Sequence, residues 1–135
     1  ECKKIILCTG GKSAPNTGSN GSGFNICKKL GHNIIHPIPA LVQLKLDYNR
    51  LKALSGVKFN GSVNLLIDNK IKEKDEGELL FTDYGISGPP ILNISGTASY
   101  NLLNKRLVEL EIDMLPNFNK EALIEFLDIE VSTIL

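Results

Sequence analysis

The sequence predicts an α+β protein in which a strand–loop–helix unit precedes a β-rich region. An apolar run at residues 4–8 leads into a loop and a helical pattern, and six of the chain's twelve glycines lie between residues 10 and 31. From residue 41 onward, short apolar runs are separated by turn residues, which is typical of a small antiparallel barrel or sandwich. The concentration of glycine indicates that the first loop does more than turn the chain.

The composition fits an ordinary globular core. The chain has 135 residues, 42% of them hydrophobic, which suits one domain or two small units. Lys plus Arg and Asp plus Glu number 15 each, so the net charge is zero, whereas nucleic-acid binders usually carry a basic excess. No apolar run approaches the roughly 20 residues of a membrane-spanning helix. We therefore expect neither a nucleic-acid partner nor a membrane.

The cysteines and histidines do not indicate a metal site. Cys2, Cys8 and Cys27 are odd in number and lack CxxC spacing, so neither a disulfide framework nor a structural zinc site is expected. His32 and His36 are four residues apart, but the glycine before them and the proline after them interrupt any helix that could align them. Free cysteines and the lack of a signal peptide favour a cytoplasmic location.

The N-terminal unit is predicted to contain a buried strand at residues 4–8, a loop at residues 9–20 and a helix from about Gly21 to Gly31. Gly31 fits the C-terminal cap of that helix. A short strand is expected at residues 33–35, and the two prolines that follow force an extended connection. We place a domain boundary near residue 40. The apolar face of the helix is expected to hold Phe24, Ile26, Cys27 and Leu30.

The second region is predicted to be mainly β. Asn60-Gly61, between apolar runs, is a strong hairpin signal, and the charged residues 68–77 resemble a second hairpin tip. One or two helical turns are expected within residues 48–54, ending at Gly56. The expected strands cover residues 41–46, 57–59, 62–68, 78–84 and 106–115, with Val108, Leu110, Ile112 and Met114 facing inward.

Two further helices are predicted. A short helix near residues 89–95 has two prolines in its first turn and Ser87 as a candidate N-cap. A second, amphipathic helix runs from about 119 to 131, with Asn119 as its cap. Its buried stripe is expected to comprise Leu123, Ile124, Phe126 and Leu127.

The glycine-rich loop superficially resembles a phosphate-binding P-loop because Gly11, Lys12 and Ser13 match the end of that motif. The motif GxxxxGK[ST] needs a glycine five residues before its second glycine, and Ile6 stands at that position. The sequence therefore does not indicate a P-loop NTPase.

Three ordered sequence blocks resemble a known family. The blocks are TGGKSAPNTGSNGSGFNICKKLGH from Thr9, PIPALVQL from Pro37, and GELLFTDYGISGP from Gly77. They are similar, in order and spacing, to the BaiN or aminoacetone-oxidase-like group of bacterial NAD(P)/FAD-dependent flavoproteins. The chain departs from the family pattern at four positions, where Ala14, Ser22, Gln43 and Asp83 replace an aromatic residue, Asp, Pro and His.

The resemblance implies a modular protein. Residues 1–40 would be a remnant of a Rossmann-like FAD-binding domain, residues 41–115 an inserted antiparallel β-barrel domain, and residues 116–135 the start of a helical subdomain. The chain lacks an initiator Met and stops within an apolar segment, so we expect an internal fragment of a longer protein.

The resemblance also implies the cofactor contacts. It places Thr9, Gly10 and Gly11 beside FAD through backbone contacts. The expected set of cofactor-binding residues is completed by Ser13, Pro15 and Gly18 of the same loop. The parent protein would use FAD and a small-molecule substrate, and NADH, NADPH and oxygen stay open as its redox partner. No catalytic acid or base and no metal ligand is assigned.

Two hypotheses for function remain from the sequence. The first is an internal fragment of a FAD-dependent oxidoreductase. By itself the fragment is expected to be inactive and to bind FAD poorly or not at all, because most of the cofactor cradle is missing. The alternative is a non-catalytic binding or scaffold module, since small barrels often bind peptides or oligonucleotides. An upstream strand–GxGxxG–helix segment in the flanking gene would favour the first hypothesis.

Overall fold

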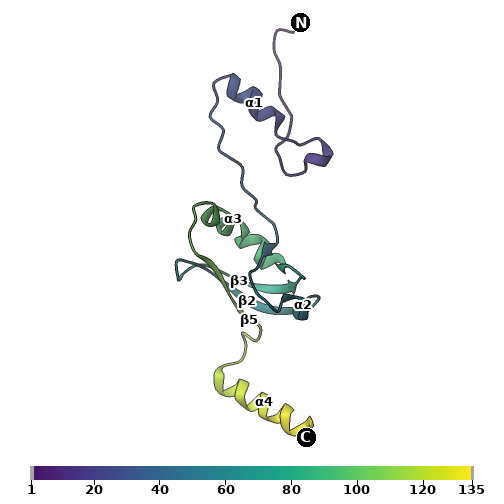
Figure 1. Cartoon of the computed structure of the whole chain (residues 1–135), viewed down its shortest axis with the longest axis vertical. Coiled ribbons are helices and arrows are strands. Elements are labelled where there is room, and N and C mark those ends of the chain that lie inside the picture. Colours follow the sequence, from purple (N-terminus) through teal and green to yellow (C-terminus); the bar gives the residue numbers. More distant parts are fainter. Residues whose placement is uncertain (1, 135) are drawn as a thin grey trace. The chain divides into compact units, whose positions relative to one another are not determined.

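The structure is a computed structural model that describes residues 2–134, with side chains described for residues 2–128. The chain divides into two compact units, Glu1–Pro39 and Ala40–Leu135. Figure 1 labels most of their helices and strands, and each unit is described here by itself.

The first unit contains one 3₁₀ turn, η1 (Pro15–Thr17), and one helix, α1 (Ser22–Lys29). The helix confirms the predicted position and its C-terminal cap. Gly31 has φ +87°, and its N–H donates to the carbonyl of Lys28, while the His32 N–H donates to the carbonyl of Cys27, both at 3.1 Å. This pair of bonds is a Schellman motif, which satisfies carbonyls at the helix end and needs a left-handed residue there.

The strand predicted at residues 4–8 is wrong. These residues form no strand, and the side chains of Ile5 and Ile6 are 74% and 87% exposed. A strand requires a neighbour to satisfy its backbone, and within the described residues of this unit the single β-bridge joins Ala14 to Ser19. The short strand predicted at residues 33–35 is absent for the same reason. The described residues of this unit therefore show no Rossmann-like sheet.

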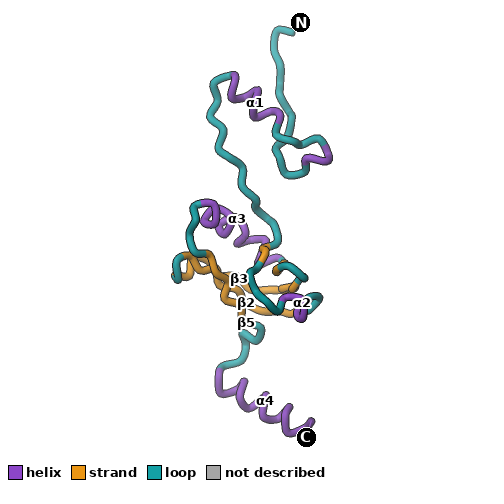
Figure 2. The backbone as a smooth tube through the Cα atoms, viewed as in Figure 1, coloured by secondary structure: helices purple, strands orange, loops and turns teal. Residues whose placement is uncertain are grey.

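The second unit is an open antiparallel sheet with helices, which confirms the α+β class and the antiparallel β-region (Figure 2). The strand order is β1-β4-β3-β2-β5, and each neighbouring pair is antiparallel. The elements in chain order are β1 (Leu44–Lys45), α2 (Leu51–Leu54), β2 (Lys58–Ile67), β3 (Lys70–Phe81), β4 (Gly85–Ser87), α3 (Pro89–Leu103), β5 (Val108–Asp113) and α4 (Lys120–Ile134).

The core lies between α3 and one face of the sheet. Alternate residues of β2 are buried, which matches the period of two expected of a strand with one covered face. The helix α3 packs against β3 and β2 and also touches β4 and β5. Burying one Leu or Ile side chain contributes about 1.5–3 kcal/mol. The buried apolar set comprises Leu51, Val63, Leu65, Ile67, Leu79, Phe81, Ile86, Ile91, Ile94 and Ala98.

The hairpin predicted at Asn60-Gly61 is wrong, because both residues lie inside β2. A Cβ on Gly61 would stand 2.5 Å from the Asp113 carbonyl oxygen, so this glycine permits the close approach of β5. The turn is formed instead by Asp68 and Asn69, with φ +51° and +63°. Two consecutive positive φ values are typical of the type I′ turn that suits the twist of a hairpin.

The remaining β predictions are corrected in length. Residues 68–77 are mostly strand β3 rather than a hairpin tip, because residues 70–77 pair with β2, with one register shift opposite Leu65 and Leu66. The strand predicted at residues 41–46 is reduced to β1, and the strand predicted at 106–115 becomes β5. The inward positions of β5 are confirmed as half-buried for Val108, Leu110 and Ile112, whereas Met114 lies beyond the strand.

Helix α3 is longer than predicted and begins differently. Its N-cap is Gly88 without a side-chain cap, and the predicted cap Ser87 belongs to β4. Gly88 has φ +118°, and a Cβ there would lie 2.2 Å from the Glu78 carbonyl oxygen. The N-cap position therefore has no room for a side chain, so the helix begins without a side-chain cap.

The predicted cap of the last helix is confirmed. The Ala122 N–H donates to Asn119 Oδ1 at 2.8 Å, and the Leu123 N–H donates to the Asn119 carbonyl at 2.9 Å. The predicted buried stripe is wrong for Ile124, Phe126 and Leu127, which are exposed, while Leu123 is half-buried. Within the described part, Phe126 packs on Phe118, with ring centroids 5.4 Å apart. An apolar stripe is buried only where a second surface covers it.

Candidate functional site

The glycine-rich loop of the first unit is closed by its own backbone. The Gly21 N–H donates to the carbonyl of Gly11 at 3.0 Å, which joins the two ends of the loop just before α1. Within it, η1 is followed by Gly18, whose N–H donates to the Pro15 carbonyl at 3.1 Å. The loop is thus a defined turn structure even though the expected strand before it is absent.

Thr9 lies directly on the first turn of α1. A Cβ on Gly23 would stand 1.9 Å from Thr9 Oγ1, so the side chain of Thr9 occupies the space that Gly23 leaves. Gly23 is the buried residue of this helix. Gly10 follows with φ +66°, a conformation that glycine adopts at little cost. Thr9 therefore holds the beginning of the loop against the first turn of α1, and Gly10 lets the chain turn away from it.

Gly11 and Gly18 present open backbone. A Cβ added at either residue would meet nothing within 4 Å. The N–H groups of Gly10 and Gly11 also donate no hydrogen bond within the described residues. Bare backbone with unused donors can accept a flat or anionic group at close range. These residues fit the close backbone contact that the family resemblance implies for FAD.

The helix start itself is already partly satisfied. Asn20 Oδ1 accepts the Ser22 N–H at 3.0 Å, and the Gly21 carbonyl accepts the Phe24 N–H at 3.1 Å. Two of the first-turn donors are therefore engaged, whereas the N–H groups of Gly10 and Gly11 donate no hydrogen bond within the described residues.

The remaining predicted residues shape the loop. Ser13 is exposed, Pro15 opens η1 and Gly18 closes it with φ +99°. The sequence interpretation overlooked Lys12, whose Cδ would lie 3.4 Å from a Cβ on Gly21. The Lys12 stem thus lies over the turn before α1 and brings a positive charge to the loop. The Gly-Lys-Ser string was the available signal, and it was considered only as a P-loop.

The third sequence block builds the second unit and not a second site. A Cβ on Gly85 would stand 1.9 Å from the Leu44 carbonyl oxygen, and Gly77 packs against Pro90. With Gly88, these glycines let β1, β3, β4 and α3 approach one another. Packing therefore explains the glycines in this block, and the described residues place no catalytic pair there.

Gln43, which departs from the family pattern, and Thr82, which follows it, differ in whether their side chains have a hydrogen-bond partner. Gln43, which stands where the family has Pro, accepts a hydrogen bond at Oε1 from the Tyr84 hydroxyl. The Oγ1 of Thr82 is buried and has no hydrogen-bond partner within the described residues.

One carboxylate of the second unit, that of Asp68, has a lowered pKa. Arg106 donates from Nε to Asp68 Oδ2 at 2.8 Å, and the Leu107 N–H donates to Asp68 Oδ1 at 3.1 Å. The hydrogen bond from Arg106 lowers the pKa of Asp68, and its charge and the Leu107 N–H act in the same direction. This pair ties the β2–β3 turn to the start of β5.

Among the described residues, no group of three or more His, Cys, Asp or Glu side chains could hold a metal ion. The helices in the described part are also too short or too polar to traverse a lipid bilayer.

Comparisons with known proteins agree with the expected resemblance. Residues 38–133 match the protein-family model described as "HI0933-like protein barrel and H2TH domain". The chain is 34% identical over 113 residues to a 3-dehydro-bile acid delta(4,6)-reductase of Clostridium scindens, which covers 84% of the chain and 28% of the relative.

Two further relatives are ribosomal RNA dihydrouridine synthases. The protein from Haemophilus influenzae is 34% identical over 123 residues, covering 90% of the chain and 28% of the relative. The protein from Escherichia coli is 32% identical over 97 residues, covering 70% of the chain and 23% of the relative. The chain thus spans about a quarter of the length of these curated relatives. By its match over residues 38–133, the chain belongs to the HI0933-like barrel and H2TH domain family.

Proposed function

We propose that this chain is an internal segment of a cytoplasmic FAD-dependent oxidoreductase. The family match over residues 38–133 carries the proposal. The names of the relatives support it, since one is a reductase and two make a dihydro base. In this assignment residues 1–40 belong to the FAD-binding domain, 41–115 to the inserted barrel and 116–135 to the start of a helical subdomain.

The glycine-rich loop is the proposed cofactor contact of this segment. Thr9, Gly10 and Gly11 would hold FAD through main-chain atoms, and Ser13, Pro15 and Gly18 would keep the loop in shape. When bound, the flavin supplies hydride transfer, and the protein supplies orientation and electrostatics. The open backbone at Gly11 and the nearby positive charge of Lys12 support this assignment.

The proposed partners are a small-molecule substrate and NAD(P)H. The zero net charge of the chain supports a small substrate over RNA. Two relatives are named for ribosomal RNA. A substrate survey must therefore distinguish an RNA substrate from a small-molecule one.

The first experiment is to purify the complete gene product and examine its colour. We expect a yellow protein that releases FAD on denaturation. A colourless product that takes up no flavin on reconstitution would contradict the proposal and favour the scaffold module.

The second experiment tests the loop. Gly11→Ala places a methyl group in open space, so the fold should be retained while close approach of FAD is blocked. In the complete gene product, we expect the variant to bind FAD about tenfold more weakly or worse, a loss of about 1.4 kcal/mol in binding free energy. Gly96→Ala is the matched control, because its Cβ would make an ordinary 3.5 Å contact with Ala40. Equal FAD affinity in both variants would remove Gly11 from the site.

A further inference from the structure

The strand β5 is an open edge of the sheet. In the order β1-β4-β3-β2-β5 it pairs, among the residues that the structure describes, with β2 alone, along Val108–Asp113. Alternate residues of an edge strand direct their N–H and C=O groups away from their single neighbour, which leaves a template for another strand. Six consecutive residues in regular register make this edge long enough for such pairing.

The inner face of β5 borders an apolar groove. The groove has a volume of about 780 Å³. Its apolar lining includes Leu46, Leu54, Phe81, Val108, Leu110 and Ile112. The three β5 side chains are only half-buried, unlike their neighbours Val63, Leu65 and Ile67 on β2. A covering apolar surface would therefore remove further hydrophobic area from water.

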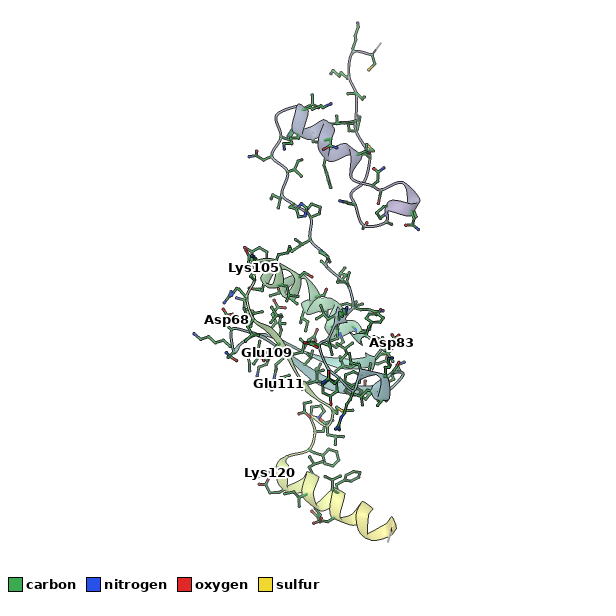
Figure 3. The ribbon with its side chains drawn as sticks, in the orientation of Figure 1. Asp68, Asp83, Lys105, Glu109, Glu111 and Lys120 are labelled. Carbon is green, nitrogen blue, oxygen red and sulfur yellow. The ribbon has the colours of Figure 1, made fainter. Side chains whose placement is uncertain are left out.

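The outer face of β5 carries a row of acids. Glu109, Glu111 and Asp113 alternate with the apolar residues, and Figure 3 labels the first two along the strand. Their partners on β2 are Leu66, Asn64 and Ser62, none of them cationic. The ion pairs found among the described residues are Lys58–Glu78 and Arg106–Asp68, so this row has no cation in contact.

Pairing with a second copy of β5 is disfavoured by this row. Antiparallel registers that keep both apolar faces on one side and pair most of the strand set Glu109 opposite Glu111, or Glu109 opposite Asp113. Like charges directly opposite each other destabilise a strand pair. The charge pattern instead complements a strand with basic residues on its outer face.

We propose that a β-strand from another part of the same, longer polypeptide pairs with β5. Its apolar side chains cover Val108, Leu110 and Ile112, and its lysines or arginines face Glu109, Glu111 and Asp113. The inference rests on the proposed function in one respect, namely that the chain is a segment of a larger protein. The first two relatives are long enough to contain such a strand outside the matched region, because that region is 28% of their length.

Hydrogen exchange tests the pairing directly. Amides of residues 108–113 are followed by mass spectrometry in the 135-residue chain and in the complete gene product. We expect exchange at least about tenfold slower in the complete product, at all protein concentrations. The β2–β3 hairpin, paired in both proteins, is the internal reference. Equal exchange of β5 in both proteins would overturn the proposal, and so would protection that depends on concentration, which indicates a second copy.

Charge reversal tests the chemistry of the partner strand. In the complete product, Glu109→Lys should remove most of the protection of β5, while Glu76→Lys on the outer face of β3 should not. Glu111 and Asp113 are left in place because their carboxylates accept hydrogen bonds from Asn64 Nδ2 and from the Leu115 N–H. Unchanged protection in the Glu109→Lys variant would refute a basic partner. A yellow product with an unprotected β5 overturns this inference alone, whereas a colourless product with a protected β5 supports it and contradicts the FAD proposal.

Discussion

At the scale of single residues, glycines fall into two groups that the sequence alone does not separate. Gly61, Gly85 and Gly88 are required by backbone atoms closer than a Cβ allows, while Gly11 and Gly18 face open space. The glycine content predicted that the first loop does more than turn the chain. Whether a glycine is required by close packing depends on the atoms that lie opposite it. That information comes from distant segments of the chain.

Gly61→Ala tests the first group. The added methyl group would stand 2.5 Å from the Asp113 carbonyl, so β5 must move or its pairing must break. Overpacking of this kind costs about 1–3 kcal/mol, or more where backbone is the obstacle. Thermal unfolding of Gly61→Ala and of Gly11→Ala checks this, and we expect a large fall in Tm only for Gly61→Ala. A similar fall in both variants would show that the assignment of open and closed positions is wrong.

Thr82→Val tests the buried hydroxyl without a partner. A buried unsatisfied polar group costs about 1–3 kcal/mol, so replacing the hydroxyl with a methyl group of similar size should leave stability unchanged or raise it. The control is Thr97→Val, which removes a 2.7 Å hydrogen bond to Glu73 Oε1 and should lower stability by about 1 kcal/mol. Denaturant unfolding measures both. Marked destabilisation by Thr82→Val would show that the hydroxyl has a partner.

At the scale of elements, local signals predicted the caps well and the strand ends poorly. The Gly31 and Asn119 caps depend on residues within one helical turn, so the sequence nearby is sufficient to find them. Asn60-Gly61 is an equally good local signal, but the pairing of β2 with both β3 and β5 overrides it. The strand predicted at residues 4–8 failed because a strand is defined by its neighbour.

The turn between β2 and β3 leads to a prediction about pH. The folded-state pKa of Asp68 is depressed, mainly by the hydrogen bond from Arg106, so ionised Asp68 favours the folded state. This contribution is fully present above the ordinary pKa of aspartate, about 3.9, and is lost as pH falls through the lower folded-state pKa. Because the pair is exposed to solvent, salt should weaken the effect.

The measurement is Tm as a function of pH for the parent chain and for Asp68→Asn. Asn tolerates the positive φ at this position, so the turn should persist in the variant. We expect the variant to lose part of the decline in Tm at acidic pH. Identical acid profiles for the parent chain and Asp68→Asn would exclude a contribution from Asp68.

At the scale of the whole molecule, the sequence predicted the class and the family but not the sheet order. The resemblance in three blocks agrees with the family match, and the α+β class is observed. The order β1-β4-β3-β2-β5 could not be predicted because it depends on pairings between residues up to about fifty positions apart, such as Ser62 with Asp113. The candidate cofactor loop was located by its glycines, and its cofactor contacts remain a prediction.

The 135-residue chain by itself should bind FAD poorly or not at all. The loop of the first unit contributes a few backbone donors, whereas a dinucleotide fold provides a sheet, a GxGxxG turn and an acidic ribose ligand. Titration of FAD fluorescence with the purified chain measures this. Micromolar affinity with quenched fluorescence would show that this segment contains most of the cradle.

The hydrogen bonds of Ser95 also determine how far the second unit can be shortened from its N-terminal side. Its Oγ accepts the Val42 N–H at 3.1 Å and donates to the Leu92 carbonyl at 2.7 Å, so the strand-free stretch before β1 is fastened to the buried side of α3. An expression product that starts at β1 would lose the hydrogen bond from Val42, and the Ser95 hydroxyl would keep only its bond to Leu92. One that starts at residue 40 would keep both bonds, and limited proteolysis should therefore trim the chain back to about that position and stop.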